Sequence, residues 1–129
     1  MLIAKLLVLH FIADFVLQPR EMGAKKSSDL RWLGAHLAIQ FAIFAPFTSI
    51  LFAFANCAIH GVIDWFIWRG YKWSVYKRLY DTGNGKMGHS LMSDQGEWRF
   101  WMDHLFFTTI GLDQLLHALT LIFLAGRFL

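Results

Sequence analysis

The sequence predicts an all-α integral membrane protein, a bundle of four transmembrane helices with an interfacial segment between the third and the fourth. Hydrophobic residues make up 57% of the 129-residue chain and charged residues only 16%, with a mean hydropathy of +0.44. Soluble domains are usually about 45–50% apolar and about 25% charged. The apolar residues also form runs that approach the roughly 20 residues needed to cross a bilayer. The length predicts a single domain, residues 1–129.

The four helices are expected at residues 1–18, 30–45, 49–68 and 100–125. Pro19 ends the first of them, because proline disfavours a helical conformation in the residue before it. Residues 1–17 are not followed by a small-x-small cleavage site, so we expect a retained helix and not a signal peptide. Pro46 interrupts the apolar run that begins at Trp32, and it therefore separates the second helix from the third.

Two connecting segments, residues 19–31 and 69–99, are polar. Aromatic and basic side chains are interleaved over residues 68–80, a composition that suits a helix at the level of the lipid headgroups. Residues 81–97 are rich in glycine and polar side chains and are expected to form a loop. The two polar segments hold ten of the twelve lysines and arginines, which predicts that both are cytoplasmic and that both termini lie outside. The expected location is the cell (inner) membrane, crossed several times.

Histidine and aspartate recur four residues apart in three of the expected helices, as His10-x-x-x-Asp14, His60-x-x-x-Asp64 and Asp113-x-x-x-His117. This spacing puts both members of a pair on one face of a helix. Ionisable groups within a membrane are paired or functional, because an unpaired buried charge is costly. The polar faces of four helices are expected to meet inside the bundle, in its cytoplasmic half. The candidate metal ligands are His10, Asp14, His36, His60, Asp64, Asp113 and His117.

Imidazole nitrogen and carboxylate oxygen are the ligands of zinc, manganese and iron sites. We expect one or two divalent ions, with zinc the leading candidate and manganese or iron as alternatives. The residues expected to surround and orient the ligands are Gln18, Gln40, Asn56 and Gln114. An alternative interpretation is that each His–Asp pair only satisfies itself and fixes helix packing. The residues expected to lie outside the site are His89, Asp103 and His104.

This ligand set favours a metal-dependent hydrolase that acts on a membrane lipid or a lipid-linked substrate, although it leaves open whether the protein is an enzyme. The metal would activate a bound water, with Asp14, Asp64 and Asp113 as the catalytic carboxylates. One alternative is a proton or cation path within a transporter. Another is a non-catalytic accessory subunit of a larger membrane complex, and a homo-oligomer is also possible.

Several other classes are disfavoured by the sequence. The basic residues flank apolar segments and do not gather in one patch, which argues against nucleic acid as a partner. Cys57 is the single cysteine, so an intrachain disulfide and a cysteine-based metal cage are excluded. Residues 83–86 lack the spacing of a phosphate-binding loop and are expected to form a turn. No serine lies beside a histidine and a carboxylate in the expected helices, so a serine-hydrolase triad is not expected.

The order of these motifs resembles one known family. The residues that carry the resemblance are the run His10 to Pro19, the lone helix histidine at position 36, the run His60 to Asp64, and the run Leu112 to His117. They resemble the family called domain of unknown function 3307, small membrane proteins of bacteria and their phages. The resemblance covers nearly the whole chain and implies that the His, Asp and Gln residues of these motifs form one set. It implies no activity.

Overall fold

The computed structural model describes residues 1–81 and 104–129, with side chains for residues 1–77 and 104–129, and this part of the chain is helical without strands. Its elements are α1 (Leu2–Phe11), the π-helix η1 (Ile12–Val16), α2 (Arg20–Lys25), α3 (Leu30–Phe44), the 3₁₀ turn η2 (Ala45–Phe47), α4 (Ile50–Asp81) and α6 (Phe106–Phe128). Within these residues, three stretches are long and apolar enough to cross a membrane: Leu30–Phe47, Ile50–Lys77 and Phe106–Phe128.

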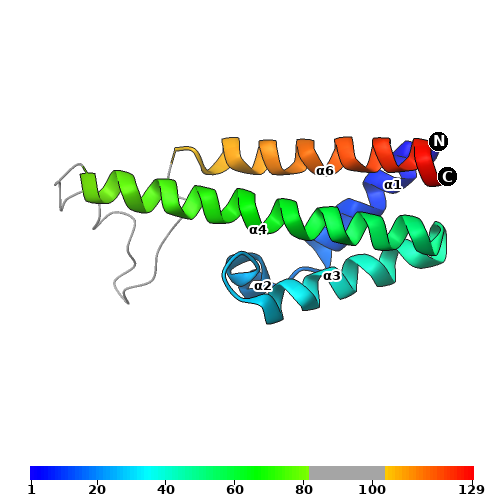
Figure 1. Ribbon diagram of the computed structural model, residues 1–129, viewed down its shortest axis with the longest axis horizontal. Coiled ribbons are helices and arrows are strands. Elements are labelled where there is room, and N and C mark those ends of the chain that lie inside the picture. The colour runs from blue at the N-terminus through cyan, green and yellow to red at the C-terminus, as the bar shows by residue number, and fades with distance from the viewer. Residues whose placement is uncertain (82–103) are drawn as a thin grey trace.

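The long helices run alternately up and down the molecule (Figure 1). Helices α4 and α6 pack side by side, α3 packs against α4, and α1 packs against α6. The N- and C-termini lie close together at one end, and α2 lies away from them, beside the start of α3 (Figure 1). The short connection through η2 joins the antiparallel pair α3 and α4, as in other up-and-down bundles.

The first helix differs from its expected form. An unbroken helix over residues 1–18 was expected, but α1 ends at Phe11 and the π-helix Ile12–Val16 follows it. The amide of Leu17 donates to the carbonyl of Ile12 at 2.9 Å, a bond that spans five residues. The interrupted segment falls short of the span length that α3, α4 and α6 reach, so the structure has three clear candidates among its described residues and not four.

The segment after the third expected helix also differs. Helix α4 does not stop at Trp68 but continues to Asp81, because Gly70 alone is too weak a signal to end a helix. Tyr71 and Val75 are buried on this extension, where they pack with Trp68 and Phe106. The predicted separate interfacial segment is therefore, in its first half, the end of a long helix.

Two further features differ from those expected: the segment after Pro19 and the start of the last helix. Residues 20–25 form the short helix α2 inside what was expected to be a plain polar loop, and Met22 on this helix is buried. Helix α6 begins at Phe106, whereas a start at residue 100 was expected. Residues 82–103 lie outside the described part of the chain, and with them the expected loop, the turn at residues 83–86, His89 and Asp103.

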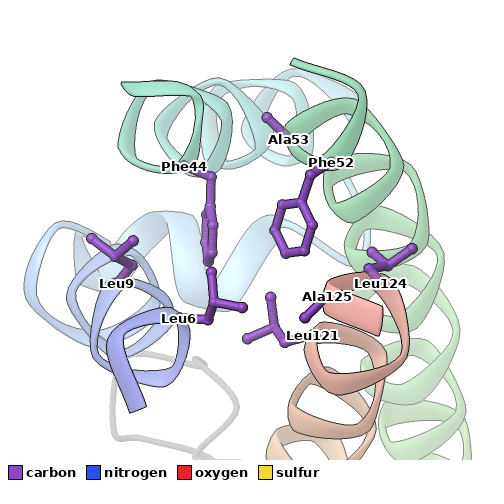
Figure 2. Close-up of a cluster of buried hydrophobic side chains, with 8 residues drawn as sticks. All are labelled: Leu6, Leu9, Phe44, Phe52, Ala53, Leu121, Leu124 and Ala125. Carbon is purple, nitrogen blue, oxygen red and sulfur yellow. The ribbon is translucent and has the colours of Figure 1, made fainter. Parts of the chain in front are cut away.

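An apolar core fills the end of the bundle that carries the termini. Figure 2 shows its side chains pointing toward one another from α1, α3, α4 and α6. Its members are Leu6, Leu9, Phe44, Phe52, Ala53, Leu121, Leu124 and Ala125. Leu6, Phe44 and Leu121 each lie one helical turn from a polar residue of the candidate site, on the side toward the termini. The core and the polar residues are thus two consecutive layers of one bundle.

Helix α3 packs closely against α4 at Gly61. A Cβ atom on Gly61 would lie 2.9 Å from Cδ1 of Leu37, closer than packed side chains come. His60 precedes this glycine, and the residue before Leu37 is His36. The missing side chain therefore lets the two histidines face each other across the helix pair.

Gly61→Leu is expected to lower the free energy of unfolding by about 1–3 kcal/mol, the usual cost of forcing extra atoms into a packed interface. Gly34→Leu is the matched control, because a Cβ on Gly34 meets nothing within 4 Å. Thermal or denaturant unfolding in mild detergent measures both variants. Equal stability of the two would contradict the close approach of α3 and α4.

Candidate metal centre

The seven predicted ligands lie together in the middle of the bundle. They come from every long element: His10 and Asp14 from α1 and η1, His36 from α3, His60 and Asp64 from α4, and Asp113 and His117 from α6. None of the seven is more than 4% exposed. The four polar faces expected from the spacing of histidine and aspartate therefore meet in one place.

Four of the side chains aim one atom each at a common point. Nε2 of His36 and Nε2 of His60 are 2.9 Å apart. Oδ1 of Asp14 lies 3.1 Å from the first and 3.3 Å from the second. Oδ2 of Asp64 lies 3.2 Å and 3.1 Å from the same two nitrogens. Four ligands in a tetrahedron around zinc, at about 2.0 Å from it, are about 3.3 Å apart, and these five distances are close to that value.

Hydrogen bonds among the four side chains account poorly for this geometry. Each imidazole Nε2 carries at most one proton, and an ionised carboxylate carries none. Two protons at most are available for the five close contacts between His36, His60, Asp14 and Asp64. The other contacts would place lone pairs against lone pairs, an arrangement that a cation at the common point would stabilise.

A second group of ligand atoms lies next to the first. Candidate ligand atoms of Asp14, Asp113 and His117 lie within 4.8 Å of one another, and Nε2 of His117 is 3.5 Å from Oδ1 of Asp113. Oδ2 of Asp14 lies 3.5 Å from Nε2 of His10 and accepts a hydrogen bond of 3.2 Å from Gln114. Asp14 therefore presents one carboxylate oxygen to each group and can bridge two ions.

The π-helix η1 gives Asp14 this position. A π-helical turn holds more residues than an α-helical turn, so it shifts Asp14 relative to the α-helical spacing expected after His10. Such turns occur frequently at functional sites. The amphipathic pattern predicted the pair, but the wider turn that sets its geometry could not be read from an i, i+4 spacing.

Two of the four predicted supporting residues contact the ligands. Gln40 donates to Oδ1 of Asp14 at 2.7 Å. Gln114 donates to Oδ2 of Asp14 and, at 3.3 Å, to Oδ2 of Asp113, so one amide holds two carboxylates together. Asn56 is buried, but its Nδ2 has no hydrogen-bond partner among the described residues. Gln18 lies against α2, where a Cβ on Gly23 would meet its Nε2 at 2.8 Å.

The imidazole rings support one another by packing. The rings of His60 and His117 stack with centroids 3.9 Å apart, and His10 lies within 5.4 Å of the first and 5.0 Å of the second. The Nδ1 atoms of His10, His36 and His60 have no hydrogen-bond partner in the described structure. The orientation of these rings therefore depends on ring contacts and not on the carboxylate or carbonyl that usually fixes a metal-bound histidine.

Lys26 is a member of the site that sequence reasoning missed. Its Nζ lies 2.8 Å from Oδ1 of Asp64, and its side chain is only 5% exposed. The sequence placed it in a polar loop, but Met22 and Lys26, four residues apart, are the buried face that α2 turns toward the bundle. That spacing was the one signal that could have identified it. With neutral histidines, three aspartates and one lysine leave two negative charges, which one divalent cation would balance.

Comparison with known proteins identifies the family. A family model described as "Protein of unknown function (DUF3307)" matches residues 2–128. The chain belongs to the DUF3307 family. No curated protein and no solved structure matches it. The resemblance seen in the motifs is thus confirmed over almost the full length.

The candidate site of this DUF3307 protein is reached from one side. A cavity of about 640 Å³ is lined by Asp14, Asp113 and Gln114 together with residues of η1, α2, α4 and α6. His36, His60 and Asp64 do not line it. The first ligand group is therefore enclosed, and the second faces the cavity. His104 is exposed at the start of α6, away from both groups, where it was expected to be.

Lys26→Met is expected to destabilise the protein by about 3–5 kcal/mol, because it removes the cation from a buried ion pair and leaves Asp64 uncompensated. Lys25→Met is the control, since the Lys25 side chain is 54% exposed and exposed pairs contribute little. Unfolding midpoints in detergent, measured with a chelator present, compare the two. A Lys26→Met protein as stable as Lys25→Met would show that Lys26 does not neutralise the centre.

Proposed function

We propose that this protein is a metal-dependent hydrolase that acts on a lipid or a lipid-linked substrate. One observation carries the proposal: two imidazole nitrogens and two carboxylate oxygens, from η1, α3 and α4, make five close contacts of 2.9–3.3 Å, the spacing of ligands around a single ion. Zinc is the leading candidate, because it accepts imidazole and carboxylate ligands in this geometry. Manganese and iron accept the same ligands.

The two ligand groups support different roles. An ion enclosed by His36, His60, Asp14 and Asp64 has four protein ligands, the usual number for a structural site. An ion held by Asp14, Asp113 and His117 would keep a position for water on the side of the cavity. Three protein ligands and one open position characterise catalytic zinc sites. We therefore assign the reacting water to the second group.

The proposed reaction is hydrolysis of an ester. The ion would activate a water for attack on the ester centre, one proton of that water would move to a carboxylate, and the proton would then pass to the leaving alcohol as the ester bond breaks. Asp113 would both hold the second ion and take up this proton, because it lines the cavity and its Oδ1 has no hydrogen-bond partner within the described residues. Asp14 and Asp64 would act through the ions.

The apolar core argues against a proton or cation path through the bundle. A path needs polar groups from one side of the membrane to the other. Between the candidate site and the end that carries the termini, the interior of the described bundle is filled by the side chains of Figure 2. The polar centre opens into a cavity lined by η1, α2, α4 and α6, on the side away from the apolar core, which suits a substrate that diffuses in.

We further propose that α1 and η1 together form a fourth, short membrane crossing, in the cell (inner) membrane. The two termini lie at the same end of the molecule (Figure 1), which an even number of crossings requires. Helix α2, which begins at Arg20 and ends at Lys25, the start of α3 and the end of α4 all lie away from the termini (Figure 1). The positive-inside rule then places that end in the cytoplasm and both termini outside.

A reporter fused after Leu129 is expected to sense the outer side of the membrane. A reporter inserted at the turn near Pro46 should give the same result. A reporter inserted near residue 85 should sense the cytoplasm. An alkaline phosphatase and a green fluorescent protein fused at each position provide opposite readouts. Termini on opposite sides would show that α1 and η1 do not cross.

His60→Ala and Asp64→Asn are each expected to lower metal affinity by more than about a hundredfold, because loss of a direct ligand costs more than loss of its supporting contact. Activity should fall with the metal, while insertion into the membrane is retained. His104→Ala, at an exposed histidine outside the site, should change neither. Elemental analysis of protein purified in mild detergent, and thermal shift on adding zinc, manganese or iron, measure the effect. A wild-type protein that holds no metal and is stabilised by none would refute the hydrolase.

A further inference from the structure

The cavity beside the metal centre has walls of two kinds. Its volume of about 640 Å³ falls in the range of sites that bind drug-sized ligands, about 300–1,000 Å³. Its apolar lining comes from Phe15, Trp68, Tyr71, Phe106 and Ile110. Its charged lining comes from Asp14, Arg20, Glu21, Lys25, Lys26, Lys72 and Asp113. A ligand that fills the cavity must therefore offer apolar surface to one part of the lining and charged groups to the other.

The charged lining favours an anion. Four of its side chains are positive and three are negative, and two of the negative ones, Asp14 and Asp113, are the proposed ligands of the second ion. With a divalent ion bound there, the excess of positive charge around the cavity grows. Arg20, Lys25 and Lys72 surround the opening from α2 and α4. Arginine and lysine side chains are the usual partners of phosphate oxygens.

Unpaired polar atoms in the lining provide an independent observation. Nε1 of Trp68 and Oε1 of Gln18 are buried, and neither has a hydrogen-bond partner among the residues described. Both residues line the cavity. A buried donor or acceptor without a partner costs about 1–3 kcal/mol, so each is expected to find one in a bound molecule. The indole N–H of Trp68 is a donor that suits an anionic oxygen.

The apolar lining argues for more than a free anion. Three aromatic rings and an isoleucine from α4 and α6 face Phe15 of η1 across the cavity. Inorganic phosphate has no apolar part and would leave these side chains in contact with water. An acyl or prenyl chain would cover them. Phe15 is also 49% exposed on the outer face of η1, where an apolar chain would continue toward lipid.

We infer that the cavity binds an anionic, phosphate-bearing amphiphile, with the phosphate between the metal centre and Arg20, Lys25 and Trp68 and its chain against the aromatic wall. The inference rests on the proposed function and names its substrate class as a lipid phosphate ester. On hydrolysis, water oxygen would bond to phosphorus, the ester oxygen would leave as an alcohol, and phosphate would remain at the cationic wall. The step needs no oxidant or further reactant.

The test uses the full chain in mild detergent, with and without zinc. Four probes separate the two halves of the ligand: dioctanoyl phosphatidic acid, dioctanoyl phosphatidylcholine, dioctanoylglycerol and glycerol 3-phosphate. Binding is measured by native mass spectrometry, and metal content is measured on the same samples. Phosphatidic acid is expected to bind at least about tenfold more tightly than each other probe, because only it combines apolar chains with a phosphate monoester whose negative charge no choline cation balances.

Variants locate the binding to the cavity. The double variant Arg20→Gln, Lys25→Gln and the single variant Trp68→Phe are each expected to weaken phosphatidic acid binding by about tenfold, with zinc content unchanged. The matched double control is Arg31→Gln, Lys77→Gln, which removes the same charge from exposed side chains outside the cavity lining and should bind like wild type.

The outcomes separate this inference from the proposed hydrolase. Zinc binding without a preference for phosphatidic acid would overturn the inference and leave the metal site standing. Glycerol 3-phosphate binding as tightly as phosphatidic acid would also overturn it, because the apolar wall would then contribute nothing. A preference for phosphatidic acid that is lost in the cavity variants, in protein that binds no zinc, would support the cavity and refute the hydrolase.

Discussion

The structure depends on three carboxylates being enclosed between helices with a single lysine to offset them. Asp14, Asp64 and Asp113 are each at most 4% exposed, and burying a charge without a partner costs several kcal/mol. Much of the surrounding structure supplies positive charge or hydrogen-bond donors to these groups. Helix α2 folds against the bundle and brings Lys26 to Asp64, and the amides of Gln40 and Gln114 donate to the others. A divalent cation at the common point of the ligands would complete the compensation.

Self-contained His–Asp pairs that only fix helix packing explain the site less well than a shared centre. In such pairs each histidine would contact the aspartate of its own helix. Instead, His36 has no aspartate partner in its own helix and lies 3.1 Å from Asp14 and 3.2 Å from Asp64. Nε2 of His60 lies 3.3 Å from Asp14 of η1, almost as near as the 3.1 Å to Asp64 of its own helix. The contacts interlock three elements, η1, α3 and α4, so the site and the packing of the bundle are one feature.

The division of the bundle into an apolar and a polar layer relates the fold to the proposed chemistry. The apolar core closes one end of the interior, and the cavity opens the polar layer to the side of η1, α2, α4 and α6. Water and a substrate headgroup can then meet the second ligand group while the first stays enclosed. This arrangement suits a reaction on a molecule that is partly held by lipid, and membership of DUF3307 makes it a hypothesis for related chains as well.

The sequence alone determined the helical class, the apolar segments, the family and the residues of the candidate site. It could do so because hydrophobic runs and an i, i+4 spacing are local properties of a helix. It misjudged the length of α4, the π-helical turn at Asp14 and the short helix α2, and it missed Lys26. Only the tertiary structure decided these, because each depends on a contact between distant segments: Tyr71 and Val75 extend α4 by packing with Phe106, and Lys26 is buried because Asp64, 38 positions away in the sequence, requires a cation.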